Sequence, residues 1–93
     1  MEPQPQPSEI TADLTRYLQS EILNDALGRD IHPTEDLLGT DMVDSMGMLR
    51  FIGYIENRYQ IVVQPEDQVI ENFMSIEHIV RFVQGKQSSS SRQ

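Results

Sequence analysis

The chain has 93 residues, and its 15 acidic side chains against seven basic ones give a net charge of -8. A chain of this length forms one small domain and buries only about 60–65 per cent of its unfolded surface, which excludes a deep catalytic cleft. The negative charge opposes binding to nucleic acid and to anionic membranes, so the expected partner is a protein. The absence of cysteine excludes disulfides and thiolate metal sites.

The two ends of the chain have compositions that oppose folding. Residues 1–7 contain three prolines, which remove amide donors and favour extended conformations. Residues 86–93 are polar, low in complexity and without an apolar side chain. We expect a disordered leader over 1–7, a folded domain over 8–85 and a disordered tail over 86–93. With no signal-peptide pattern and no apolar run of membrane-spanning length, a cytoplasmic protein is expected.

Apolar residues recur at helical spacing over 8–27, which predicts a first helix of about five turns. Ser8 can cap its start and Gly28 can end it. The buried face is expected to consist of Ile10, Leu14, Tyr17, Leu18, Ile22 and Ala26.

The periodicity disappears over 29–44, where Pro33, Gly39 and five acidic residues occur. This pattern predicts a long loop between the first and second helices, and loops of this length in a compact domain are often functional. The side chains expected to pin the loop to the core are Leu37, Leu38, Met42 and Val43.

A second helix is predicted over 45–59, and residues 61–63 (IVV) read as an apolar connector because an isolated strand would have nothing to pair with. A short third helix is predicted over 65–73, where proline and two acids open the segment. Ser75 can cap a last helix that Gly85 ends. The predicted fold is all-α, a four-helix bundle of three long helices and a short third one around an aliphatic core.

Few residues of the chain suit catalysis or metal binding. His32 and His78 are far apart in the sequence, and neither has a second histidine at the spacing of a zinc site, so no metal is expected. Ser45 lacks the strand, turn and helix context of a hydrolase nucleophile. The glycines are scattered and make no phosphate-binding loop. No catalytic residue is therefore predicted.

Two residues compete to cap the second helix. Ser45 and Asp44 both suit this position, and neither is followed three residues later by Glu or Gln, so no capping box decides between them. Ser45 can therefore be only a cap, or it can be the functional residue of the protein.

Four segments in order carry a resemblance to a known family: EDLLG, VDSMGMLRFIGYIENRY, VVQPED and FMSIEHIVRFV. Over roughly residues 10–84 the chain resembles the acyl carrier and peptidyl carrier proteins. Their motif is Asp-Ser-Leu at the start of the second helix, and Asp44, Ser45 and Met46 occupy its positions. The D-S-M-G start is similar to D-alanyl carriers, and the downstream YIE is similar to stand-alone aryl carriers, which favours a specialised member.

The resemblance implies a bundle of the acyl-carrier type that is not itself an enzyme. It implies that a phosphopantetheinyl transferase attaches 4'-phosphopantetheine from coenzyme A to Ser45, with Asp44 as its motif neighbour. Acyl, aminoacyl or aryl groups would be carried as thioesters, loaded by an activating ligase and passed to acyl-transfer enzymes. A monomer is expected.

The second helix departs from the pattern of fatty acid carriers, because Glu56 is its only acid. Docking is therefore expected to rely more on apolar contacts. The residues expected to bind partners are Met46, Met48, Leu49, Arg50 and Glu56. Some of the methionines can instead fill the core, and for Leu49 the core and the surface remain open.

Two further observations bear on function. Gly53 and Tyr54 replace the residue types that fatty acyl carriers use there, which argues against an acyl chain stored inside the bundle. The rival interpretation is a small acidic helical adaptor that binds a partner helix, with Ser45 only a cap.

Overall fold

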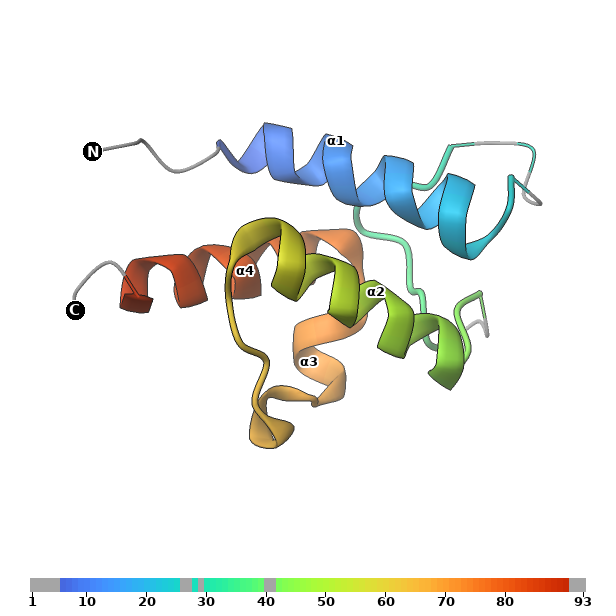
Figure 1. The fold of residues 1–93 in the computed structure, drawn as a ribbon. Coiled ribbons are helices and arrows are strands. Elements are labelled where there is room, and N and C mark those ends of the chain that lie inside the picture. Colours follow the sequence, from blue (N-terminus) through green and yellow to red (C-terminus); the bar gives the residue numbers. More distant parts are fainter. Residues whose placement is uncertain (1–5, 26–27, 29, 40–41, 91–93) are drawn as a thin grey trace.

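A computed structural model describes residues 6–25, 28, 30–39 and 42–90 (Figure 1). Within this part of the chain every regular element is helical, and there is no strand. The elements are α1 (Pro7–Tyr17), the π-helix η1 (Leu18–Ile22), α2 (Ser45–Tyr59), the 3-10 helix η2 (Pro65–Asp67), α3 (Ile70–Phe73) and α4 (Ile76–Ser90). The predicted all-α bundle of three long helices and a short third one is confirmed.

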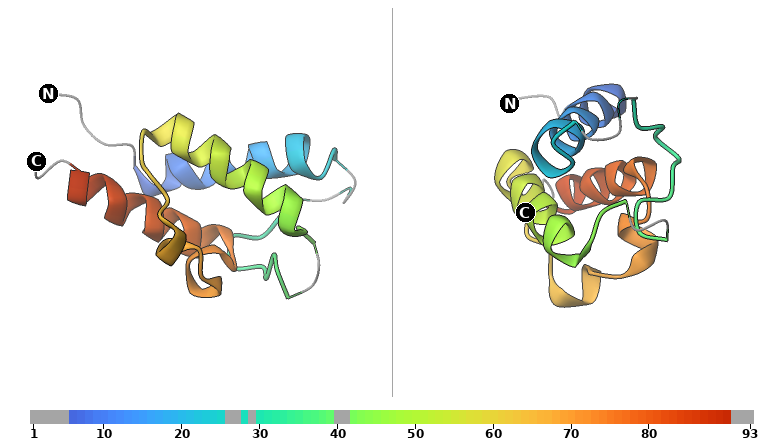
Figure 2. Two further views of the ribbon diagram at one scale, coloured as in Figure 1. Left: turned by 60° about the horizontal axis from the view of Figure 1, so that its bottom comes forward. Right: turned by 90° about the vertical axis from the view of Figure 1, so that its right-hand side faces the viewer.

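The three long helices α1, α2 and α4 lie side by side, and α3 lies beside one end of α4 (Figures 1 and 2). Their apolar faces meet in one core with completely buried side chains from each of them. These are Ile10, Leu14, Phe51, Ile55, Ile76, Ile79 and Val83, and Leu18 of η1 joins them. The helical spacing of the apolar residues thus places each apolar face toward the other two helices.

The start of α1 is capped by Gln6, so the predicted cap at Ser8 is wrong. The amide of Gln6 donates a hydrogen bond to Oε1 of Glu9 at 2.8 Å, and Pro7 occupies the first helical position. Proline fits there because its missing amide would have no partner in the helix anyway.

The first helix is shorter than predicted. It widens into the π-helix η1, where the amide of Leu23 donates to the carbonyl of Leu18 at 2.9 Å, and it ends at Ile22. Asn24 and Asp25 then take left-handed backbone angles, with φ of 52° and 59°, which stop the helix. The predicted end at residue 27 is therefore wrong, and that residue lies outside the described ranges.

The predicted pinning of the long loop is confirmed. Leu37 and Val43 are buried, and Leu38 and Met42 pack partly buried against the core. The amide of Val43 donates to the carbonyl of Leu37 at 3.0 Å, which closes this part of the loop. The loop therefore holds the residues just before α2 in a defined position.

The connector over 61–64 has no regular structure, as predicted. The third helix is not one element, because the backbone of Val69 is extended and separates η2 from α3. Ser75 does cap α4, since its hydroxyl accepts a hydrogen bond from the amide of His78 at 3.2 Å. The predicted stop at Gly85 is wrong, and residues 86–90 of the predicted disordered tail are helical.

Candidate functional site

Two neighbouring residues at the start of α2, Asp44 and Ser45, occupy different positions relative to the helix. Asp44 is the cap, and its Oδ1 accepts a hydrogen bond from the amide of Gly47 at 2.7 Å. Ser45 is the first residue inside the helix. The interpretation of Ser45 as the helix cap is therefore wrong, and its hydroxyl is not needed to start the helix.

The hydroxyl of Ser45 is exposed and makes no hydrogen bond to any residue that the structure describes. The amides of Ser45 and Met46 lie in the same first turn, where an α-helix offers them no carbonyl partner. Such a turn favours an anion by about 0.3–1 kcal/mol at an exposed site. The residues present thus fit an anionic group attached to this oxygen, such as a phosphodiester.

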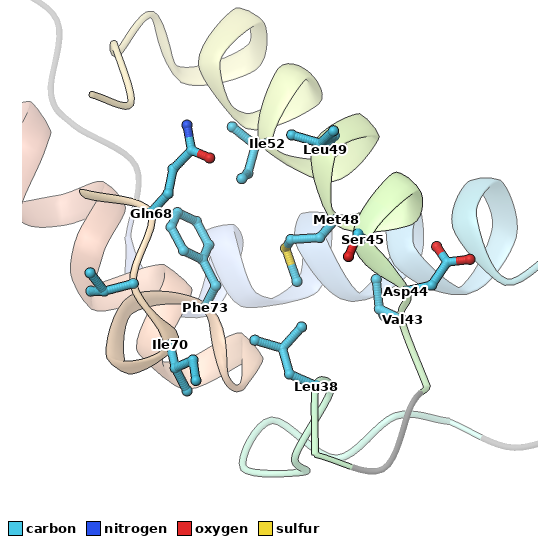
Figure 3. A pocket seen from close by; sticks show the side chains of 11 residues that line it. Leu38, Val43, Asp44, Ser45, Met48, Leu49, Ile52, Gln68, Ile70 and Phe73 are labelled. Atoms are coloured by element: carbon cyan, nitrogen blue, oxygen red, sulfur yellow. The ribbon is translucent and has the colours of Figure 1, made fainter. Parts of the chain in front are cut away.

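A groove of about 510 Å³ opens beside Ser45 between α2, the loop and α3; we call it the α3-side groove (Figure 3). Most of its walls are apolar. It is lined by Leu38, Val43, Asp44, Ser45, Met48, Leu49, Ile52, Gln68, Val69, Ile70 and Phe73. A flexible group attached to Ser45 would therefore have apolar surface next to its point of attachment.

A second groove, of about 300 Å³, lies between the same turn of α2 and η1; we call it the η1-side groove. It is lined by Ile22, Leu23, Met42, Val43, Asp44, Met46, Gly47 and Arg50. Gly47 lets the two elements approach closely, since a Cβ atom there would lie 3.2 Å from Cγ2 of Ile22. The turn that bears Ser45 thus borders two separate grooves.

Replacing Asp44 by alanine is expected to lower the free energy of unfolding by about 1 kcal/mol, because the amide of Gly47 loses its acceptor. Asp44→Asn is the matched control, since asparagine caps as well as aspartate and should keep most of the stability. Urea denaturation followed by circular dichroism measures both. Equal losses in the two variants would show that charge, and not capping, matters at this position.

The five residues that the sequence proposed for partner binding are not all at the surface. Met46 and Leu49 are 69% and 56% exposed, which places Leu49 outside the core. Met48 is buried in the core, and it also lines the α3-side groove. Arg50 is exposed, whereas Glu56 accepts a hydrogen bond from the amide of Val63 at 2.9 Å and holds the connector.

The two histidines do not form a joint site. Nδ1 of His78 lies 2.6 Å from the hydroxyl of Ser75, and His32 contacts Thr34 in the loop. In the described ranges, no three His, Asp or Glu side chains come together to hold a metal ion. Among the described helices, none has the length and apolar character needed to cross a membrane.

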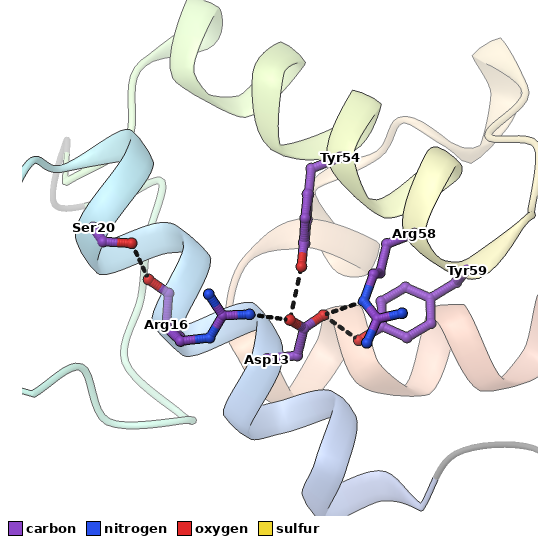
Figure 4. A network of polar contacts seen from close by, with 6 residues as sticks. All are labelled: Asp13, Arg16, Ser20, Tyr54, Arg58 and Tyr59. Atoms are coloured by element: carbon purple, nitrogen blue, oxygen red, sulfur yellow. Dashed lines mark hydrogen bonds and ion pairs between the residues drawn. The ribbon is translucent and has the colours of Figure 1, made fainter.

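Sequence reasoning missed a polar cluster between α1 and α2, centred on Asp13 (Figure 4). The hydroxyls of Tyr54 and Tyr59 donate to its two carboxylate oxygens at 2.7 and 2.6 Å. Arg58 and Arg16 lie 3.5 and 2.8 Å from the same carboxylate. Asp13 lies on the same face of the first helix as Ile10 and Tyr17. This position among apolar residues was the sequence signal that could have predicted polar contacts for Asp13 inside the bundle.

These contacts change the acidity of the groups in the cluster. Burial alone would raise the pKa of Asp13, but the hydrogen bonds from Tyr59 and Tyr54 and the nearby guanidinium groups hold it below its ordinary value. Burial and the same carboxylate raise the pKa of Tyr59 well above its usual range. The carboxylate is therefore charged and both hydroxyls are protonated at neutral pH.

The ring of Tyr54 also stacks on Tyr17 of α1, with centroids 3.8 Å apart. Together with the Asp13 contacts, this stack joins α1 to α2 along their interface. Ser45 itself lines the mostly apolar α3-side groove, which opens between α2, the loop and α3.

A comparison with protein families agrees with this geometry. The family model described as "phosphopantetheine attachment site" matches residues 20–83, which include all of α2 and the loop before it. A search of curated proteins found no match. The matched segment covers more than half of the chain. The chain therefore belongs to the phosphopantetheine attachment family of carrier domains, in which 4'-phosphopantetheine is the attached group.

Proposed function

We propose that Ser45 is the residue to which 4'-phosphopantetheine is attached. The observation that carries the proposal is the division of tasks at the start of α2: Asp44 caps the helix, and the hydroxyl of Ser45 is exposed and unbonded among the described residues. Helix amides beside this oxygen favour the anionic phosphodiester.

The attachment reaction needs only a nucleophilic oxygen from this chain. The hydroxyl of Ser45 attacks the phosphorus that bears the pantetheine group of coenzyme A, so that a new O–P bond forms. The bond from that phosphorus to the adenosine 3',5'-bisphosphate leaving group breaks, and the hydroxyl proton passes to a base. A phosphopantetheinyl transferase supplies that base, which agrees with the absence of a histidine contact to Ser45 among the described residues.

When attached, the group supplies a terminal thiol on which acyl, aminoacyl or aryl groups are carried as thioesters. The chain contributes the anchoring oxygen and the apolar walls of the α3-side groove, among them Leu49 and Ile52. The Tyr17–Tyr54 stack and the Asp13 cluster occupy the interface between α1 and α2. These contacts support the proposal that the cargo stays outside this interface. The protein has no cysteine that would compete with this thiol for acyl groups.

The proposed role is that of a non-catalytic carrier in a biosynthetic pathway. Its partners are the transferase, an activating ligase that loads the cargo, and enzymes that accept the acyl group. Met46 and Leu49 support apolar contacts with these partners, because both are large apolar side chains exposed beside Ser45. A monomer in the cytoplasm remains the expectation from the sequence.

Intact-mass spectrometry tests the proposal. The purified protein is incubated with coenzyme A, Mg²⁺ and a broad-specificity phosphopantetheinyl transferase, and its mass should rise by one phosphopantetheine group. Tryptic peptides should place the added mass on the peptide that contains Ser45. A chain that several different transferases all leave unmodified would contradict the proposal.

A further inference from the structure

Lys86 is the only lysine of the chain, and it lies in the part of α4 that continues beyond Gly85. Its Nζ forms an ion pair with Oδ2 of Asp67 in η2 at 2.6 Å. The two side chains are only 28% and 21% exposed, so water and salt screen this pair less than the more exposed pair of Arg81 with Glu77. The end of α4 is therefore joined to η2 by a contact between opposite charges.

Asp67 is the residue at which three segments meet. Its Oδ2 also accepts a hydrogen bond from the amide of Gln64 at 2.9 Å, where the connector ends. Its carbonyl accepts a hydrogen bond from Nδ2 of Asn72 in α3 at 2.7 Å. Through Asp67, the ammonium of Lys86 therefore holds the connector, η2 and α3 against α4.

Lys86 also contacts the aromatic pair that joins α3 to α4. Its Nζ lies 5.7 Å from the centroid of the Phe82 ring. That ring packs against the ring of Phe73, with centroids 5.3 Å apart, and Phe73 is a buried side chain that lines the α3-side groove. The same cation thus supports this segment through both a polar and an aromatic contact.

One wall of the α3-side groove is built by the segment that Asp67 holds in place. This segment contributes Gln68, Val69, Ile70 and Phe73 (Figure 3). Among the described residues, no hydrogen bond or ion pair joins residues 65–73 to α2, which forms the opposite wall. The separation of the two walls therefore depends on the contacts that hold this segment to α4.

We propose that Lys86 is a positioning residue: its ammonium holds η2 and α3 in place and so sets the width of the α3-side groove beside Ser45. The family model matches residues 20–83, which include Asp67 and the groove but not Lys86. The helical residues beyond Gly85 bring this cation to Asp67, so the contact extends beyond the segment that the family model matches. The inference rests on the proposed function only because the groove matters as the surroundings of the attached group.

Hydrogen exchange at single amides, measured by NMR on the unmodified full chain, tests the proposal. Lys86→Met keeps a long unbranched side chain and removes the charge, so the hydrogen-bonded amides within 67–72 should exchange about fivefold faster. Lys86→Arg keeps the charge and should stay within about twofold of wild type. Arg81→Met is the matched control, because it removes a cation whose partner, Glu77, lies in the same helix, and it should leave these amides unchanged.

The amides of α1 and α2 show whether a variant is destabilised as a whole. If they accelerate in Lys86→Met by the same factor as the amides within 67–72, the ion pair stabilises the entire bundle and positions no wall, which overturns the inference. Unchanged exchange within 67–72 would overturn it as well.

Thiol reactivity then connects the wall to the groove, and the absence of native cysteine makes a single introduced thiol unambiguous. In Met48→Cys the thiol replaces a buried side chain that lines the groove, and it should react with a small disulfide reagent about fivefold faster when Lys86→Met is added. In Ile55→Cys the thiol is buried away from the groove, and its rate should not change. Equal acceleration at both positions, or none at Met48, would contradict the proposal. Neither measurement uses the attachment reaction, so a failure to modify Ser45 would count against the proposed function alone.

Discussion

Ser45→Ala is expected to abolish the attachment of phosphopantetheine completely and to leave the fold intact. The methyl group offers no oxygen to attack coenzyme A, so the intact mass should stay that of the unmodified chain. Because Asp44 supplies the cap, the free energy of unfolding should change by no more than about 0.5 kcal/mol. Mass spectrometry and urea denaturation on the same preparation measure both quantities.

Two further variants sharpen this result. Ser8→Ala removes another exposed serine from the first turn of a helix and should be modified as fast as wild type. Ser45→Asp keeps a polar side chain at the same position and should nevertheless remain unmodified. If Ser45→Ala still gains the mass, attachment occurs at another hydroxyl and the assignment of Ser45 is wrong.

The second large effect is expected from Asp13→Ala, which should lower the free energy of unfolding by about 2–4 kcal/mol at neutral pH. The variant removes the acceptor of two tyrosine hydroxyls, and Tyr59 is buried, so its hydroxyl cannot turn fully to water. A domain of this size has a total stability near the lower end of about 5–15 kcal/mol, so the loss is a large part of it.

The contribution of Asp13 should also depend on pH. Its pKa in the folded protein is held below the ordinary carboxyl value, so the stability it contributes is fully present above that value. It is lost as the pH falls through the folded-state pKa. The difference in unfolding free energy between wild type and Asp13→Ala should therefore be constant from about pH 5 to 7 and shrink as the pH falls below about 4.

Arg16→Ala provides the control for this cluster. Arg16 contacts the same carboxylate, but its side chain is 70% exposed, and exposed ion pairs contribute only about 0–1 kcal/mol. The variant should thus unfold close to wild type. If Arg16→Ala and Asp13→Ala lose equal stability, the ion pair matters more than the tyrosine hydrogen bonds.

Much of the fold could be predicted from the sequence, because α2 and the start of α4 depend on local signals. The bounds of α2 agree with the prediction, since its apolar residues are strictly periodic and Asp44 and Ser45 both mark its start. The all-helical class follows from the same periodicity. These features require no knowledge of contacts between distant residues.

The errors occur where local and tertiary preferences compete. The first helix ends early because Asn24 and Asp25 adopt left-handed angles, which these two residue types tolerate better than most. The third segment splits because Val69 is extended. The final helix passes Gly85 because a glycine in a helix weakens it by only about 1 kcal/mol and does not by itself end it.

The attachment residue Ser45 remains a prediction, and the geometry around it could be predicted only in part. The motif placed Asp44 and Ser45 together, but only the structure decides which of the two side chains faces the amide of Gly47. The burial of Met48 depends on which face of α2 meets the core. The pairing of Tyr59 with Asp13 joins residues far apart in the chain, which periodicity cannot show.

The division between Asp44 and Ser45 has a practical consequence. Asp44 stabilises the start of α2, whereas the proposed attachment oxygen belongs to Ser45, so labelling at Ser45 should leave the cap intact. Coenzyme A bearing a fluorophore on its thiol should therefore yield a protein with one dye at a known position and an unchanged melting temperature. Such a conjugate would turn the carrier into a direct optical probe for its own partner enzymes.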